Sequence, residues 1–206
     1  MKRPKILVIG FGPFPGAPTN PSTEVALSLA HSKRAARLAR VRAMAVPTVY
    51  AEIAKFPGLI AKEKPDAVLM FGLARRARAL RIETRGKNRA SLLHPDAAGR
   101  KGKRVLVPRA ARTLPVTAPG RGLLAAARAA GAKARLSSDA GDYICNAALF
   151  YALHASERKN APLVAFVHIP LPSAHGKDGT RPAMATLRRA AEAILVSLAR
   201  TAKTSA

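Results

Sequence analysis

The chain contains a single cysteine, Cys145, in surroundings that suit a nucleophile. Asp139, Gly141 and Asp142 supply turn-forming residues directly before it, and residues 143–156 have a helical pattern. We therefore expect the thiol in the first turn of a helix, where the helix dipole favours a thiolate and free N–H groups can hold the oxyanion of an acyl intermediate. The alternative is a small buried hydrophobe, which is the more frequent role of a lone cysteine.

A thiolate nucleophile needs a base, and His168 is the best placed of the five histidines. It stands near the end of the apolar run in residues 162–172, which predicts a buried strand. Active sites of open α/β sheets collect at the carboxyl ends of such strands. The other four lie in helix or loop contexts: His31, His94, His154 and His175. A core histidine bonded to the backbone is the alternative for His168.

Glu83 is the only acidic residue between Asp66 and Asp96, and arginines flank it. These cations keep the carboxylate ionised. The functional interpretation is that Glu83 orients His168, so that nucleophile, base and orienting carboxylate form a catalytic triad. The simpler interpretation is a surface salt bridge.

The glycine-rich turn of residues 10–22 carries neither nucleotide-binding fingerprint. Gly10, Gly12 and Gly16 miss the dinucleotide spacing by one residue, and no Gly-Lys-Ser/Thr comes after them. The turn instead places Phe11 and Phe14 at the mouth of the predicted sheet, where they can line a small apolar pocket. No cysteine or histidine cluster has metal-ligand spacing, so we expect no metal site.

Short apolar runs alternate with amphipathic stretches, which is typical of an α/β domain with a mostly parallel sheet. The expected strands are residues 5–11, 39–47, 66–73, the end of 120–137, and 162–172. The expected helices are residues 20–32, 50–65, the start of 120–137, 143–156, and 182–200. The run at 66–73 is apolar throughout, which predicts a central strand.

Residues 74–119 form a long basic region with short strand-like pieces at 79–85 and 104–108. A functional excursion is expected here, because structureless stretches of this length are uncommon inside a compact domain. The 206 residues suit a single domain spanning 1–206, with a frayed tail from about residue 200.

The formal net charge is +25, from 36 Lys and Arg against 11 Asp and Glu. Such a field attracts nucleic acid nonspecifically. The basic residues are nevertheless spread along the chain, so a solvated basic surface is the favoured interpretation and a dedicated nucleic-acid role the lesser one.

One cysteine cannot form an internal disulfide, which favours a reducing compartment, and we expect the cytoplasm. No uninterrupted apolar stretch reaches the ~18 residues of a membrane span. We therefore expect a soluble protein without membrane association. The basic and apolar N-terminus resembles a signal peptide, but its apolar run is short and Pro13 and Pro15 interrupt the chain just after it, so a buried first strand is favoured.

Four segments, taken in order, resemble the pyroglutamyl peptidases type I, also called pyrrolidone-carboxylate peptidases, which are cysteine peptidases. They are KILVIGFGPFPGAPTNPS, RIETRGKN, SDAGDYICNAALFYALH and FVHIPLP. The resemblance implies a three-layer α/β/α sandwich with a twisted sheet, cytoplasmic location, no cofactor, and often a homotetramer. The implied reaction removes an N-terminal pyroglutamate from a peptide.

By position, the resemblance makes Cys145 the nucleophile, His168 the general base and acid, and Glu83 its orienter. Phe11, Phe14 and Tyr143 fall where the family builds its pocket for the lactam ring. Other positions depart from the family pattern: Gly12, Pro15, Arg75, Arg76, Ala77 and Leu93. Two alternatives therefore remain open, which are a related cysteine hydrolase with altered acyl specificity or low activity, and a basic scaffold that binds nucleic acid or acidic partners.

Overall fold

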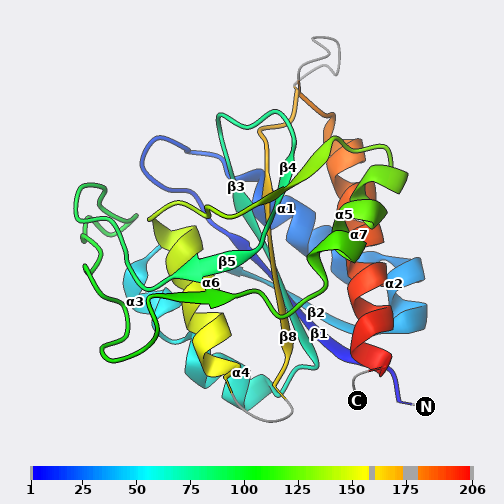
Figure 1. The fold of residues 1–206 in the computed structure, drawn as a ribbon. Coiled ribbons are helices and arrows are strands. Elements are labelled where there is room, and N and C mark those ends of the chain that lie inside the picture. Colours follow the sequence, from blue (N-terminus) through cyan, green and yellow to red (C-terminus); the bar gives the residue numbers. More distant parts are fainter. Residues whose placement is uncertain (1, 158–160, 174–180, 205–206) are drawn as a thin grey trace.

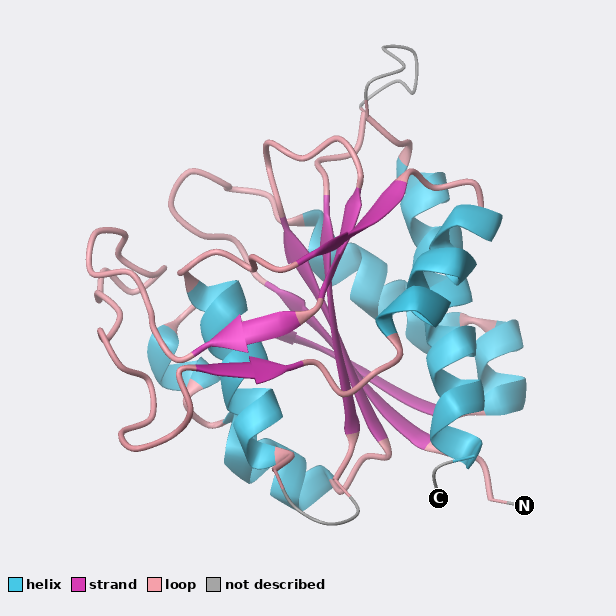
Figure 2. Cartoon of the chain, in the orientation of Figure 1, coloured by secondary structure: helices cyan, strands magenta, loops and turns pink. Residues whose placement is uncertain are grey.

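A twisted six-stranded sheet organises the chain, with strand order β2-β1-β3-β8-β4-β7 (Figures 1 and 2). The computed structural model describes residues 2–157, 161–173 and 181–204. The strands of this sheet are β1 (Lys5–Phe11), β2 (Arg40–Val46), β3 (Ala67–Leu73), β4 (Leu80–Glu83), β7 (Ala134–Ser137) and β8 (Leu163–Ile169). The expected strands therefore form, and β3 is central as its apolar run predicts.

The sheet is mostly parallel, with one reversal. β2, β1, β3 and β8 pair in parallel, whereas β4 runs antiparallel to β8 and parallel to β7. The reversed pairing sets Arg81 opposite His168 and Ile82 opposite Val167. A segment of the long basic region thereby enters the sheet beside the strand that carries the histidine.

Helices cover both faces of the sheet and confirm the three-layer sandwich (Figure 1). One face packs against α1 (Pro21–Ser28), α2 (Lys33–Leu38), α5 (Gly120–Ala129) and α7 (Met184–Thr204). The other face packs against α3 (Tyr50–Ile53), α4 (Phe56–Glu63) and α6 (Ile144–Ala155). A short 3₁₀ turn, η1 (Leu29–His31), comes directly after α1.

Strand alternation decides which side chains face α6. In β8, Val164 and Phe166 belong to the core on the α6 side, and Val167 belongs to the opposite core. His168 has the parity of Phe166 and so projects toward α6. The same alternation in β4, where Ile82 packs into the opposite core, turns Glu83 toward α6 as well.

The basic region forms an antiparallel pair of strands, called here the basic hairpin, and the long connection between them, residues 88–112, called here the covering segment. β5 (Arg85–Lys87) pairs antiparallel with β6 (Thr113–Pro115) and lies over α6. The strand-like piece at 104–108 is not a strand. The side chain of Asn88 accepts hydrogen bonds from the backbone N–H groups of Leu106 and Val107, at 3.0 and 2.9 Å, and so holds this piece as a loop.

Two further expectations need correction. The helix expected over 50–65 is broken into α3 and α4, because Pro57 has no backbone N–H and its ring conflicts with the carbonyl of residue 53. The tail expected to fray from about residue 200 continues α7 to Thr204, with Ala202 buried, and only residues 205 and 206 lie outside the described residues. No helix in the described ranges combines the length and apolarity needed to cross a membrane.

Candidate active site

Cys145 is the second residue of α6, as the turn-forming residues before it predict. Gly141 adopts a positive φ of 81°, which is the left-handed turn conformation that favours glycine. Tyr143 is the N-cap in extended conformation, and no side chain caps the helix. The first N–H groups of α6 are therefore without intrahelical partners or a side-chain cap beside the half-buried thiol.

Gly72 makes room for this thiol. It lies near the end of β3, in register with His168. A Cβ on Gly72 would stand 2.8 Å from Cys145 Sγ and 2.7 Å from Cζ of Phe166, closer than real Cβ contacts. The absence of a side chain at Gly72 thus leaves space beside β3 for the Cys145 sulfur of α6.

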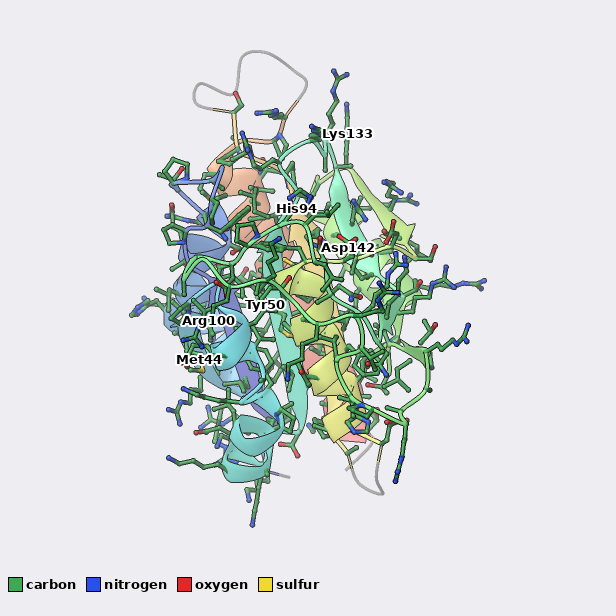
Figure 3. The ribbon with its side chains drawn as sticks, turned by 90° about the vertical axis from the view of Figure 1, so that its left-hand side faces the viewer. Met44, Tyr50, His94, Arg100, Lys133 and Asp142 are labelled. Carbon is green, nitrogen blue, oxygen red and sulfur yellow. The ribbon has the colours of Figure 1, made fainter. Side chains whose placement is uncertain are left out.

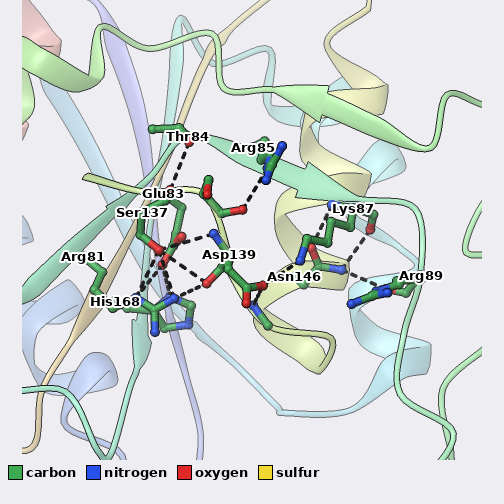
Figure 4. Close-up of polar contacts among 12 residues, drawn as sticks. Arg81, Glu83, Thr84, Arg85, Lys87, Arg89, Ser137, Asp139, Asn146 and His168 are labelled. Carbon is green, nitrogen blue, oxygen red and sulfur yellow. Dashed lines mark hydrogen bonds and ion pairs between the residues drawn. The ribbon is translucent and has the colours of Figure 1, made fainter. Parts of the chain in front are cut away.

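His168 and Glu83 form a buried hydrogen-bonded pair (Figure 4). His168 Nδ1 lies 2.8 Å from Glu83 Oε1, and the glutamate side chain is fully buried. This excludes the surface salt bridge considered for Glu83. The other ring nitrogen of His168, Nε2, is not engaged by Glu83, and Cys145 acts on the imidazole through its charge and a side-chain hydrogen bond.

The charge state of His168 is set by these neighbours. Burial lowers the pKa of His168, but the negative charge of Cys145, the hydrogen bond with Cys145, and the hydrogen bond and charge of Glu83 outweigh burial and raise it to about 9. At neutral pH the imidazole is therefore protonated. A protonated imidazole between a cysteine and a glutamate is an arrangement suited to nucleophilic catalysis by sulfur.

Arg81, two residues before Glu83 on the same face of β4, supports the pair formed by Glu83 and His168. Its Nε lies 3.3 Å from Glu83 Oε1, and its guanidinium also donates to Ser137 Oγ and to the carbonyl of Asp139 (Figure 4). The Asp139 carboxylate is in turn held by Lys87 Nζ at 2.8 Å. The arginines that flank Glu83 in sequence thus include one that touches it.

A cavity of about 330 Å³ opens onto the thiol. Five of the six predicted site residues line it, namely Phe11, Phe14, Tyr143, Cys145 and His168. The sixth, Glu83, does not line the cavity but is hydrogen-bonded to His168. Two separate pairs of aromatic rings contribute to it: Phe14 and Tyr143 lie 5.8 Å apart, and Phe11 and Phe166 lie 6.0 Å apart, between ring centroids. The structure therefore brings the predicted site residues together.

The residues at which the sequence departs from the family pattern divide into two groups. Arg75 lines the cavity. Leu93 does not line it and is 80% exposed. Arg75 therefore places a guanidinium in the lining of the cavity that contains the thiol, whereas the side chain of Leu93 points to solvent.

Polar side chains that the sequence analysis missed fix the loops around the cavity. Asn20 caps α1 through Oδ1 and donates to the carbonyl of Gly12 at 2.9 Å, and Thr48 donates to the same carbonyl at 2.7 Å. Asn20 directly before Pro21 is a helix-start signal that could have indicated this role.

Asn146, next to the thiol on α6, is fully buried and anchors β5. Its side chain accepts from Lys87 N and donates to the carbonyls of Lys87 and Arg89, each at 2.8 Å (Figure 4). These bonds hold the basic hairpin against the beginning of α6. No local sequence signal indicates them, because they join segments almost 60 residues apart.

Asp96 ties the covering segment to the beginning of α3, because its carboxylate accepts from the backbone N–H groups of Tyr50, Ala98 and Arg100. Burial raises the pKa of Asp96, but these three bonds and the Arg100 charge lower it below its ordinary value. Tyr143 also donates to the Pro95 carbonyl at 2.8 Å. Figure 3 shows this side of the molecule, with Tyr50 and Asp142 around the beginning of α6.

In the described part of the chain, no group of three or more His, Cys, Asp or Glu side chains could hold a metal ion. The chemistry available at the cavity is that of a thiol, an imidazole and a carboxylate in series. Fold and site together define an α/β protein with the side-chain set of a cysteine hydrolase.

Comparison with known proteins gives the family. The profile of the family described as "Pyroglutamyl peptidase" matches residues 4–203. The chain is 33% identical over 193 residues to a pyrrolidone-carboxylate peptidase of Thermococcus kodakarensis, covering 91% of this chain and 92% of the relative. It is 33% identical over 202 residues to one of Streptomyces coelicolor, covering 96% and 93%. The chain belongs to the pyroglutamyl peptidase family and is a cysteine-type peptidase.

Solved structures agree with this assignment. A mutant pyrrolidone carboxyl peptidase from Pyrococcus furiosus superposes with a TM-score of 0.84 at 27% identity, covering 96% of this chain and 98% of that one. Pyroglutamyl peptidase I from Bacillus amyloliquefaciens superposes with a TM-score of 0.85 at 22% identity, covering 96% of each chain, and supports the fold.

Proposed function

We propose that this protein removes an N-terminal pyroglutamate from peptides, with Cys145 as nucleophile, His168 as general acid and base, and Glu83 as the group that orients His168. The observation that carries the proposal is the series from Glu83 Oε1 through His168 to the thiol at the start of α6, in a cavity lined by Phe11 and Phe14. Family membership supports the same substrate.

The reaction divides into two acyl transfers. Cys145 Sγ attacks the pyroglutamyl carbonyl carbon, and N–H groups in the first turn of α6 stabilise the resulting oxyanion. The C–N bond then breaks as protonated His168 gives its proton to the leaving amine. Water attacks the thioester, His168 accepts a proton from that water, and pyroglutamate leaves as the Sγ–C bond breaks.

The cavity suits an uncharged lactam ring. Phe11, Phe14 and Tyr143 supply apolar walls, while the side chains of Asn20 and Thr48 also line it but are engaged with the Gly12 carbonyl. A flat five-membered ring without charge fits such walls, and its amide groups require only a few polar partners.

A fluorogenic pyroglutamyl amide tests the proposal, with the matching prolyl amide as control. The prolyl ring has the same size but carries a charged amine and lacks the lactam carbonyl. We expect hydrolysis of the pyroglutamyl amide, little of the prolyl amide, and none by Cys145→Ala. Equal activity of Cys145→Ala would refute the role of the thiol, and failure to hydrolyse the pyroglutamyl amide would refute the substrate.

The second candidate is a cysteine hydrolase with a different acyl preference, and Arg75 in the cavity favours it. A panel of N-acyl peptides distinguishes the two. If pyroglutamyl is clearly the best acyl group, this second candidate fails.

We also propose a homo-oligomer in the cytoplasm. The resemblance to the family, which often forms tetramers, and the single cysteine support this. Exposed Leu92, Leu93 and Val105 on the covering segment supply apolar surface for contact between copies. Light scattering after gel filtration checks the assembly, and a monomer at micromolar concentration would contradict it.

Nucleic acid is expected to bind only nonspecifically, with a steep loss of affinity as the salt concentration rises.

A further inference from the structure

The backbone of Arg75, an exposed residue, is held at the edge of the cavity. It stands in the turn after β3, where Ala74 N donates to the carbonyl of Ile169 at 2.8 Å and Ala77 N donates to that of Ala74 at 2.9 Å. The Arg75 carbonyl accepts from Arg181 Nη2 at 3.4 Å. The backbone that carries Arg75 is therefore bonded on both sides, and its side chain lines the cavity.

The Arg75 side chain extends from this turn toward the loop after β1. Its Nη1 lies 3.1 Å from the point where a Cβ on Gly16 would stand. Gly16 has a positive φ of 82° and stands two residues after Phe14, which lines the aromatic part of the cavity. The guanidinium thus spans the mouth, between the β3 turn and the loop that carries the ring of Phe14.

The other charged groups that line the cavity are already engaged. Arg81 donates to Ser137 and to the Asp139 carbonyl and lies beside Glu83, and Asp139 is paired with Lys87. Among the described residues, the guanidinium of Arg75 has no hydrogen bond or ion pair. A guanidinium without a partner is complementary to a carboxylate, which it can bind with two parallel hydrogen bonds.

We propose that Arg75 makes this enzyme prefer peptides that carry Asp or Glu directly after the pyroglutamate. The inference rests on the proposed function. The lactam ring is uncharged and belongs between the aromatic walls, so the carboxylate that meets Arg75 is part of the leaving peptide. Arg75 is thus a specificity-determining residue.

Two peptides of nearly equal shape measure this preference, one with Glu and one with Gln after the pyroglutamate. At low salt we expect kcat/KM to favour the Glu peptide by about two- to fivefold, the range for a partly exposed ion pair. Arg75→Ala should bring the ratio close to one, and Arg75→Lys should keep part of it. The ratio should also collapse in ~1 M salt, where screening acts within about 3 Å.

Arg76→Ala is the matched control, because Arg76 is the next residue of the turn, is exposed, and does not line the cavity. It removes the same charge and should leave the ratio as in wild type. An equal response of Arg75→Ala and Arg76→Ala would overturn the proposal and assign the preference to the overall +25 charge. A wild-type ratio of one would overturn it directly.

Alkylation of Cys145 tests, without any peptide, whether the Arg75 guanidinium attracts a carboxylate into the cavity. Iodoacetate and iodoacetamide both form an Sγ–C bond with loss of iodide, and they differ in charge but little in size. We expect Arg75→Ala to lower the ratio of the iodoacetate rate to the iodoacetamide rate several-fold, and Arg76→Ala to leave it unchanged. An unchanged ratio in Arg75→Ala would refute the role of Arg75, whereas absence of pyroglutamyl hydrolysis alone would refute only the proposed function.

Discussion

The substitution Gly72→Ala adds a methyl group and tests whether the missing side chain at the end of β3 is needed to accommodate the Cys145 thiol. The new Cβ would stand 2.8 Å from Cys145 Sγ, and ordinary contact begins at 3.4 Å, so the sulfur must move by about 0.6 Å or the strand must shift. The ring of Phe166 meets the same methyl at 2.7 Å and itself contacts His168, with 4.8 Å between ring centroids. Both reacting side chains are therefore disturbed.

These distances determine the expected size of the effect. Overpacking of a well-packed site costs about 1–3 kcal/mol of unfolding free energy. A misplacement of about 1 Å in a catalytic group can cost ~10²-fold in rate. We therefore expect Gly72→Ala to fold with reduced stability and to lose about 10- to 100-fold in kcat on a pyroglutamyl amide, with a smaller change in KM.

Gly58→Ala is the matched control. Gly58 lies in α4 with no atom within 4 Å of its added Cβ, so the substitution should raise the free energy of unfolding by up to about 1 kcal/mol and leave kcat unchanged. Urea unfolding and steady-state kinetics on both variants provide the comparison. A folded Gly72→Ala with kcat within twofold of wild type would refute the proposed seating of the thiol.

Three further substitutions test the charges around the site. Glu83→Gln keeps the shape but removes the charge beside His168, so kcat/KM should fall by about 10²- to 10⁴-fold and the pKa of His168, followed by NMR, should fall below about 9; a wild-type rate would contradict this. Because the folded pKa of His168 is raised from 6.5 to about 9, its contribution to stability is complete below pH 6.5 and is lost as the pH rises through 9; unfolding of wild type and His168→Gln over this range should show a difference that shrinks with pH, and a constant difference would argue against the charged imidazole. Asp96→Asn should reduce the free energy of unfolding at pH 7 by about 1–3 kcal/mol, because three partly buried backbone hydrogen bonds lose a charged acceptor; since the pKa of Asp96 is lowered, this difference should vanish as the pH falls below 3.8 and through the folded pKa, and a difference that persists there would contradict the assignment.

Local patterns predicted the positions of Cys145 and His168 well. The turn-forming residues before Cys145 place it at a helix start, and the apolar run around His168 places it at a strand end. Both are consequences of short-range preferences, namely capping, turn formation and strand alternation, which the sequence carries directly.

The contact between Glu83 and His168 is of a different kind. It depends on β4 running antiparallel to β8, although the two side chains are 85 residues apart in sequence. No local preference decides which strands become neighbours or in which direction they run. The sequence therefore indicated Glu83 as a candidate, but its burial and partner required the fold.

Packing partners were the least predictable part of the site. Gly72 is one of 14 glycines, and only its 2.8 Å approach to the sulfur distinguishes it. The role of Asn146 depends on two carbonyls of the hairpin, and the position of Arg75 depends on the turn after β3. Such contacts are properties of three-dimensional packing, which hydrophobic patterning does not encode.

The central claim is that Cys145 takes up the pyroglutamyl group during turnover. The most direct measurement mixes the enzyme with a pyroglutamyl peptide, quenches the reaction in acid within one turnover, and maps the protein by mass spectrometry. We predict one pyroglutamyl thioester, located on the peptide that contains Cys145 and absent from Cys145→Ala. Hydrolysis without this adduct, together with undiminished activity of Cys145→Ala, would contradict the account.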